Sequence, residues 1–113
     1  MSVSFAGFNM NALTFRCGAK ISEGTPVKIQ KSDYVTVCSI DEGFHGIAID
    51  SDTKYVSVQL KGMATLNYTG TAPATGYSNL SANGLGGVQA SASGNKYLVV
   101  SVNETAHTVT FLM

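Results

Sequence analysis

Apolar and polar residues alternate along most of the chain, which is the pattern of β-strands that bury one face. In the first such stretch, from Ala12 to Cys17, the side chains of Leu13, Phe15 and Cys17 fall on one side. No window of about a dozen residues repeats apolar positions at the spacing of an amphipathic helix. The pattern therefore predicts an all-β protein. Its strands are expected at 12–17, 25–30, 34–38, 44–49, 55–60, 63–68, 96–102 and 108–113, with two shorter segments around Leu80 and Val88.

Turn-forming residues lie between these strands. Pro26 stands near the start of its strand, where a missing N–H does least harm, and 31–33 is expected to form a hairpin turn. A polar loop is expected at 50–54, and the glycines of 84–87 indicate a tight turn that needs positive φ. In the closing pair of strands we expect Val100 and Val102 to face the same way.

Strands this short, at spacings of about 8 to 12 residues, favour a small single-domain β-barrel or sandwich of antiparallel strands. A chain of 113 residues is long enough for one hydrophobic core, and we see no internal repeat in it. The domain is expected to span 12–113.

Residues 1–11 differ from the rest, because they show neither a strand period nor a helical one. They are predicted to form an extended N-terminal arm. Phe5, Phe8 and Met10 are large apolar residues among Gly and Asn, in a segment too short to bury them locally. Two alternatives follow: the arm anchors the protein on another surface, or these three side chains fold back on the domain itself.

The chain is poor in charge: 12% of its residues are charged, and the net charge is zero. Its surface polarity must come from Ser, Thr, Asn and Gly, which lose water more readily than full charges do, so the composition favours contact with other proteins. Lys and Arg do not cluster anywhere along the chain, which argues against binding to nucleic acid. No apolar run is long enough to span a membrane, and the start lacks the features of an export signal. We therefore expect synthesis in the cytoplasm, with Cys17 and Cys38 reduced and buried.

Candidates for chemistry are few. Cys38, Asp41 and His45, with His107 as a second base, are the residue types of a nucleophilic site, but their spacing does not assemble one. Cys and His are too scattered for a zinc site, and 50–52 lacks the glycine and glutamate of a calcium loop. We expect no enzymatic activity, no metal and no cofactor.

Several short motifs follow one another in a characteristic order. They are Glu23–Val27, Phe44–Ala48, Val56–Gly62, the glycine-spaced stretch from Gly76 to Val88, and the closing segments Tyr97–Val102 and Val109–Leu112. In this order the chain resembles the capsid decoration, or cement, proteins of tailed bacteriophages. The resemblance covers residues from about Ile21 to Met113 and leaves the arm without a match.

The resemblance implies a compact β domain, usually a homotrimer, that binds the major capsid protein on the outside of the mature head. It implies no catalytic residue. Composition alone makes Phe5, Phe8 and Met10 the candidate capsid anchor. The alternative is a phage fibre or a receptor- or glycan-binding module, for which Tyr68, Tyr77 and 50–52 are the available hints.

Overall fold

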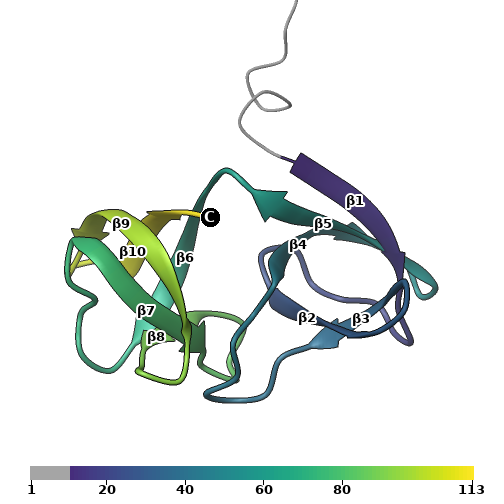
Figure 1. Cartoon of the computed structure of the whole chain (residues 1–113), viewed down its shortest axis with the longest axis horizontal. Coiled ribbons are helices and arrows are strands. Elements are labelled where there is room, and N and C mark those ends of the chain that lie inside the picture. Colours follow the sequence, from purple (N-terminus) through teal and green to yellow (C-terminus); the bar gives the residue numbers. More distant parts are fainter. Residues whose placement is uncertain (1–10) are drawn as a thin grey trace, which may run out of the picture.

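The computed structural model describes residues 11–113, which form strands and no helix (Figure 1). The all-β prediction is therefore confirmed. Among the described residues the strands are β1 (Asn11–Arg16), β2 (Pro26–Lys31), β3 (Tyr34–Val37), β4 (Gly46–Ser51), β5 (Tyr55–Lys61), β6 (Met63–Thr69), β7 (Gly76–Ala82), β8 (Val88–Ala90), β9 (Asn95–Asn103) and β10 (Thr108–Leu112).

The first half of the chain closes into a barrel with the strand order β1-β3-β2-β4-β5. Most neighbours in it are antiparallel, and β1 pairs with β5 over its whole length. The barrel is closed by a parallel contact that the sequence did not reveal, between Arg16 of β1 and Tyr34 of β3.

The second half closes into another barrel, with the order β10-β6-β8-β7-β9. Here β6 pairs antiparallel with β10 and parallel with β8, as β1 does with β5 and β3. Strand by strand, β6 to β10 repeat the topology of β1 to β5. The sequence shows no internal repeat because the repeat lies in strand order and direction, and many different apolar residues can fill a core of the same shape.

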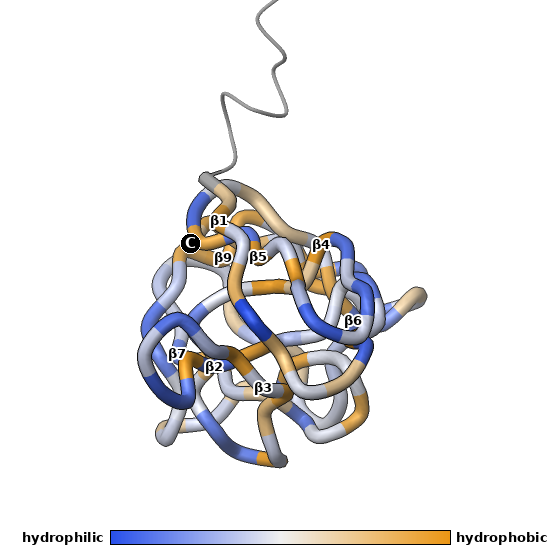
Figure 2. The backbone as a smooth tube through the Cα atoms, turned by 90° about the vertical axis from the view of Figure 1, so that its right-hand side faces the viewer, coloured by the Kyte–Doolittle hydropathy of each residue, from blue (hydrophilic) through white to orange (hydrophobic). Residues whose placement is uncertain are grey.

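The buried side chains form two clusters, not the one core that we expected. Small barrels fill their interiors with their own inward-facing side chains, so each closed sheet acquires its own cluster. Figure 2 shows the underlying alternation, with hydrophobic and hydrophilic residues following one another along the strands. The first cluster comprises Phe15, Cys17, Ile21, Val27, Val35, Ala48, Val56 and Val58. The second comprises Cys38, Phe44, Ile47, Leu66, Tyr68, Leu80, Ala82, Val88, Val99, Val109 and Phe111.

Phe44 joins the two barrels. It precedes β4 in the first half of the chain, yet its fully buried ring lies in the core of the second barrel. The ring stacks on Tyr97 with centroids 4.9 Å apart and meets Phe111 edge-on at 6.0 Å. Its carbonyl oxygen accepts hydrogen bonds from the Tyr97 hydroxyl at 2.8 Å and from Asn95 Nδ2 at 3.0 Å. The second core therefore includes residues of the first half, namely Phe44 together with Cys38 and Ile47.

Local predictions held at most turns. Pro26 is the first residue of β2, and β2 and β3 form the expected hairpin. Gly84 and Gly86 have φ of 77° and 83°, as the tight turn at 84–87 requires. The loop predicted at 50–54 is shorter, because β4 continues to Ser51.

The predicted facing of Val100 was wrong. A register shift in the β9–β10 ladder pairs Thr110 with Ser101 and Phe111 with Val99, which leaves Val100 without a partner. Such a bulge reverses the side-chain alternation in one strand. Val99 is consequently buried, Val102 packs against the core, and Val100 is 46% exposed.

Candidate protein-binding surface

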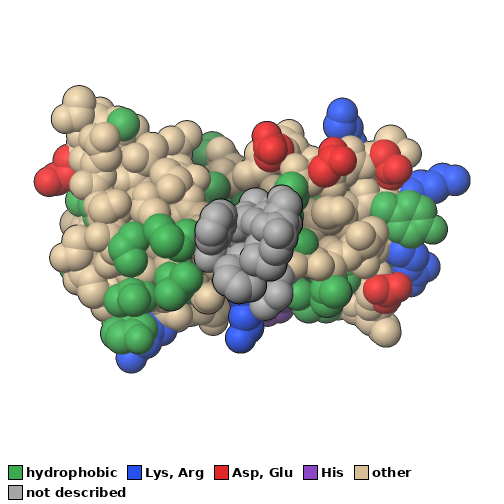
Figure 3. Space-filling model, turned by 90° about the horizontal axis from the view of Figure 1, so that it is seen from above, with side chains coloured by type: hydrophobic (Ala, Val, Ile, Leu, Met, Phe, Trp, Pro, Cys, Tyr) green, Lys and Arg blue, Asp and Glu red, His purple; other side chains and the backbone are tan. Residues whose placement is uncertain are grey.

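A row of apolar side chains crosses the outer face of the second barrel. Tyr77 of β7 pairs with Leu98 of β9, Leu98 pairs with Leu112 of β10, and Leu112 pairs with Met63 of β6. Tyr77 is 71% exposed, Met63 51% and Leu112 43%. We call these four residues, together with Val100, the outer row. Seen from above, hydrophobic side chains gather over the second barrel, on the left of Figure 3.

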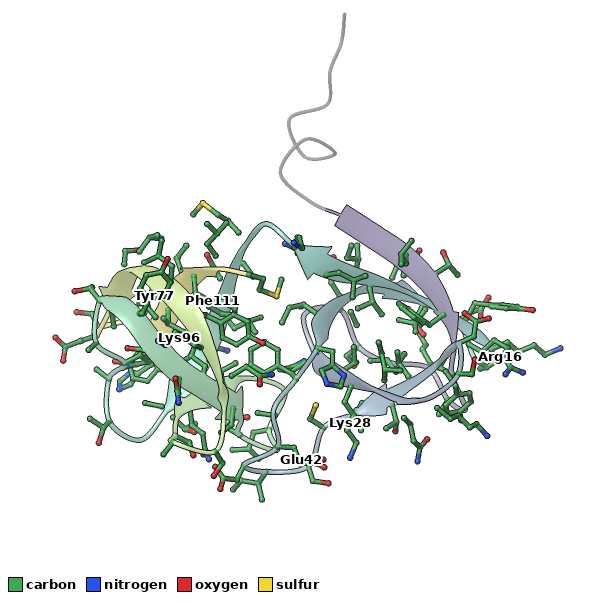
Figure 4. The ribbon with its side chains drawn as sticks, in the orientation of Figure 1. Arg16, Lys28, Glu42, Tyr77, Lys96 and Phe111 are labelled. Atoms are coloured by element: carbon green, nitrogen blue, oxygen red, sulfur yellow. The ribbon has the colours of Figure 1, made fainter. Side chains whose placement is uncertain are left out.

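The outer row follows from the strand pattern and the bulge. Its positions alternate with inward-facing ones such as Phe111 and Val99, which are buried. Val100, two positions after Leu98 in β9, lies on the same outer face, and the bulge that follows lets Val102 turn inward. At the end of the row the Lys96 ammonium lies over the Tyr77 ring, 5.8 Å from its centroid, while Phe111 points into the barrel (Figure 4).

Removing water from the outer row when a partner binds would cost little free energy, because the exposed groups are apolar. Contiguous exposed apolar patches of a few hundred Å² on soluble domains commonly mark contacts with other molecules. Neighbouring strands lie about 4.8 Å apart, so side chains in register across four of them form one continuous patch. Lys96, beside Tyr77, lies over the aromatic ring and is itself exposed to water.

A smaller apolar group lies elsewhere on the molecule. Val37, Ile40 and Leu85 are 49%, 65% and 81% exposed. A groove of about 240 Å³ runs beside them, lined by residues of both halves of the chain, including Val37, Cys38, Ala82 and Gly84. Val37 ends β3, and Ile40 and Leu85 lie in loops, so these three side chains are not aligned in register across neighbouring strands as the outer row is.

The arm residues proposed as an anchor, Phe5, Phe8 and Met10, lie outside the described residues. The structure does place the point from which they are tethered. Asn11 begins β1 and pairs with Lys61 at the end of β5, next to the connection into β6.

Cys38 is buried and unpaired, as is Cys17. Burial, and after it the nearby Glu42 carboxylate, raises the pKa of the Cys38 thiol to about 11. The thiol is therefore protonated at neutral pH, and the protonated form is the unreactive one. Its sulfur lies 3.9 Å from the carbonyl oxygen of Gly43.

The structure does not bring the candidate nucleophilic site together. His45 accepts a hydrogen bond from the Ile29 backbone N–H at its Nδ1, at 2.9 Å. His107 sits at the tip of the β9–β10 hairpin with φ of 56°, and its ring lies 5.6 Å from that of Tyr68. Within 11–113, no hydrogen bond joins Cys38, Asp41 and His45.

Asp41 instead fastens one half of the chain to the other. It lies between β3 and β4 with φ of 68°, and its N–H donates to the Ala82 carbonyl at 2.8 Å. Hydrogen bonds from serines and an amide of the second half hold the pKa of its carboxyl below the usual range, with Ser91 contributing most. The donors are Ser81, Gln89, Ser91 and Ser93. Sequence reasoning missed this cluster because its members are 40 to 52 residues from Asp41.

The acidic stretch at 50–52 is engaged by the backbone. Asp52 Oδ1 accepts hydrogen bonds from the N–H groups of Lys54 and Tyr55, at 2.7 and 2.8 Å, and these bonds lower the pKa of its carboxyl. Asp50 Oδ1 accepts one from the N–H of Ser51.

Across the described part of the chain there is no group of three or more metal-ligating side chains placed to hold an ion. Residues 11–113 contain no helix with the length and hydropathy needed to cross a membrane.

Comparison of the sequence with known protein families and with curated proteins gave no match in either case.

Proposed function

We propose that the chain is a non-enzymatic structural protein of a tailed bacteriophage, which binds the outer surface of the mature capsid as a decoration protein and stabilises it. The observation that carries the proposal is the outer row, an apolar strip on an otherwise charge-poor surface. Such a strip suits a flat protein partner better than a small ligand, which needs a concave site. The ordered motifs that resemble decoration proteins make the major capsid protein the proposed partner.

The proposed mechanism is thermodynamic linkage. A protein that binds the assembled shell and not its free subunits stabilises the shell by RT ln(1 + [L]/Kd) per site, and so opposes the outward pressure of packaged DNA. We propose that the chain acts as a homotrimer, because three rows bound together dissociate far more slowly than one. Phe5, Phe8 and Met10 would add a second contact with the capsid. The protein would be made in the host cytoplasm and function on the virion exterior, without cofactor or nucleic acid.

Co-sedimentation with expanded and unexpanded capsid shells tests the proposal. We expect the full chain to pellet with the expanded shell, and Leu112→Ser to weaken that binding. Ile40→Ser is the matched control, because it removes a more exposed apolar side chain outside the outer row. A chain beginning at Ala12 tests the contribution of the arm. A full chain that pellets with neither shell would rule out decoration.

One observation favours a second candidate, a glycan- or receptor-binding module. Tyr55 is 52% exposed and lines a shallow pocket of about 210 Å³ together with Asp50 and Asp52. An aromatic face beside carboxylates is a common way to hold a sugar. Of the two tyrosines that suggested this function from sequence, Tyr68 is buried and Tyr77 belongs to the outer row. Binding on a glycan array that Tyr55→Ala abolishes would support this candidate over decoration.

A further inference from the structure

Asn83 and Gly84 form the one Asn–Gly step of the sequence, in the tight turn between β7 and β8. In such a step the backbone nitrogen after Asn can attack the Asn side-chain amide, because glycine has no side chain to hinder the approach. We propose that Asn83 is a latent site of deamidation: the fold suppresses the reaction, and unfolding of the second barrel releases it. The proposal does not depend on capsid binding.

The reaction needs only the chain and water. The Gly84 backbone nitrogen bonds to Cγ of Asn83, and the Cγ–Nδ2 bond breaks, so that Nδ2 leaves as ammonia with the proton of the Gly84 nitrogen. The product is a five-membered succinimide ring with two carbonyl groups. Water adds to one of them and opens the ring, which leaves aspartate or isoaspartate at position 83. One water is consumed and one ammonia is released, and nothing is oxidised or reduced.

In the folded chain, hydrogen bonds hold the Asn83 amide in place. Its Oδ1 accepts bonds from the backbone N–H groups of Leu85 at 2.7 Å and Gly87 at 3.0 Å. Its Nδ2 donates to the carbonyl oxygen of Val88 at 3.4 Å. Turning Cγ onto the Gly84 nitrogen and expelling Nδ2 would disrupt these bonds. Asn83 is only 4% exposed, so little water is present to replace them, and the lost bonds raise the barrier to reaction.

The backbone of the turn is equally restricted. The N–H of Asn83 donates to the Gly87 carbonyl at 3.1 Å. Gly84 has φ of 77°, and a Cβ there would lie 3.1 Å from Cβ of Ile40. A Cβ on Gly87 would collide with the carbonyl oxygen of Asn67. Peptide groups packed this closely cannot rotate to meet the Asn83 side chain unless their neighbours move, so the turn has to open before the ring can close.

Neither product fits the closed turn. Aspartate at position 83 would place a carboxylate oxygen where Nδ2 now donates to Val88, which leaves a buried charge facing a carbonyl group. Isoaspartate would add a methylene to the main chain between Ala82 and Val88, which are paired residues of β7 and β8. A chain that reacts while it is open should therefore refold poorly, and its unfolding becomes irreversible.

Peptide mapping by mass spectrometry at mildly alkaline pH follows the reaction in the full chain. We expect deamidation at Asn83 to be at least about 100-fold slower in buffer than in guanidinium chloride, because only the open fraction reacts. Phe44→Ala should accelerate it about tenfold or more in buffer, since this substitution weakens the second core, and should leave the rate in denaturant unchanged. Phe15→Ala, in the first core, is the matched control and should accelerate it less.

Refolding tests the fate of the product. Chains that have reacted in denaturant and are then diluted into buffer should be enriched in the misfolded fraction on size-exclusion chromatography. Asn83→Asp should lower the urea midpoint, whereas Asn79→Asp, which adds the same charge at an exposed position of β7, should change it little.

Four results would overturn the proposal. The first is an equal rate of deamidation in buffer and in denaturant, and the second is no reaction in either. The third is equal acceleration by Phe44→Ala and Phe15→Ala, which would show that opening of the second barrel is not the step that releases the reaction. The fourth is that deamidated chains refold as readily as unmodified ones.

Discussion

Phe44 provides the sharpest test of how the two barrels depend on each other. Its ring is fully buried in the second barrel, although it comes from the first half of the chain. We expect Phe44→Ala to destabilise the second barrel most, because it removes the ring on which Tyr97 stacks and which Phe111 meets edge-on.

The magnitude follows from burial. Substituting a fully buried Phe by Ala costs about 3–5 kcal/mol, and the lost aromatic contacts place this site towards the upper end of that range. The total stability of a chain of this length is about 6–17 kcal/mol. We therefore expect Phe44→Ala to remove a quarter or more of the free energy of unfolding. Its urea midpoint should fall by at least about 1 M.

Urea denaturation followed by circular dichroism measures the loss, and hydrogen exchange locates it. Amides of β7, β9 and β10 should exchange faster in Phe44→Ala than in the unsubstituted chain. Phe15→Ala is the matched control, because Phe15 belongs to the first core and its loss should act first on β1 and β5. Faster exchange confined to β1–β5 in Phe44→Ala would refute the argument that Phe44 completes the second core.

Three further predictions concern single residues. Burial raises the pKa of Cys38 from 9.0 to about 11, so between these pH values unfolding releases the thiol proton. The free energy of unfolding should therefore fall from pH 9 to 11. In thermal melts over this range Cys38→Ala should show a smaller fall. The pKa of Asp41 is lowered from 3.8, so its carboxylate stabilises the folded chain above that pH and this stabilisation is lost as the pH falls below it. Asp41→Asn should be less stable at pH 7 and should lose less of its free energy of unfolding on acidification. An acid profile identical to that of the unsubstituted chain would contradict this. A Cβ on Gly46 would lie 2.4 Å from Val58 Cγ1, so Gly46→Ala should destabilise by about 1–3 kcal/mol in urea melts, and a neutral result would show that β5 can move.

The alternation of apolar residues was sufficient to predict the strands, their turns and the all-β class. It worked at β2, where Pro26 marks the start, and at the turn with Gly84 and Gly86, because these features depend on neighbouring residues alone. It failed at Val100, because a bulge is set by the partner strand as well as by the strand itself.

The candidate surface was predictable only in part. The charge-poor composition pointed to protein contact, and alternation places Leu98 and Leu112 opposite the buried positions of their strands. That they join Tyr77 and Met63 in one row depends on the register of three strand pairs, which no local pattern encodes.

The residue order thus determined which segments extend, where they turn and that the surface would carry little charge, because each of these depends on side chains close together in the chain. Closure into two barrels, the transfer of Phe44 into the second core and the gathering of serines around Asp41 came from tertiary contacts. These join residues some 40 to 50 or more positions apart, and their free energy is gained only when the strands have found their partners.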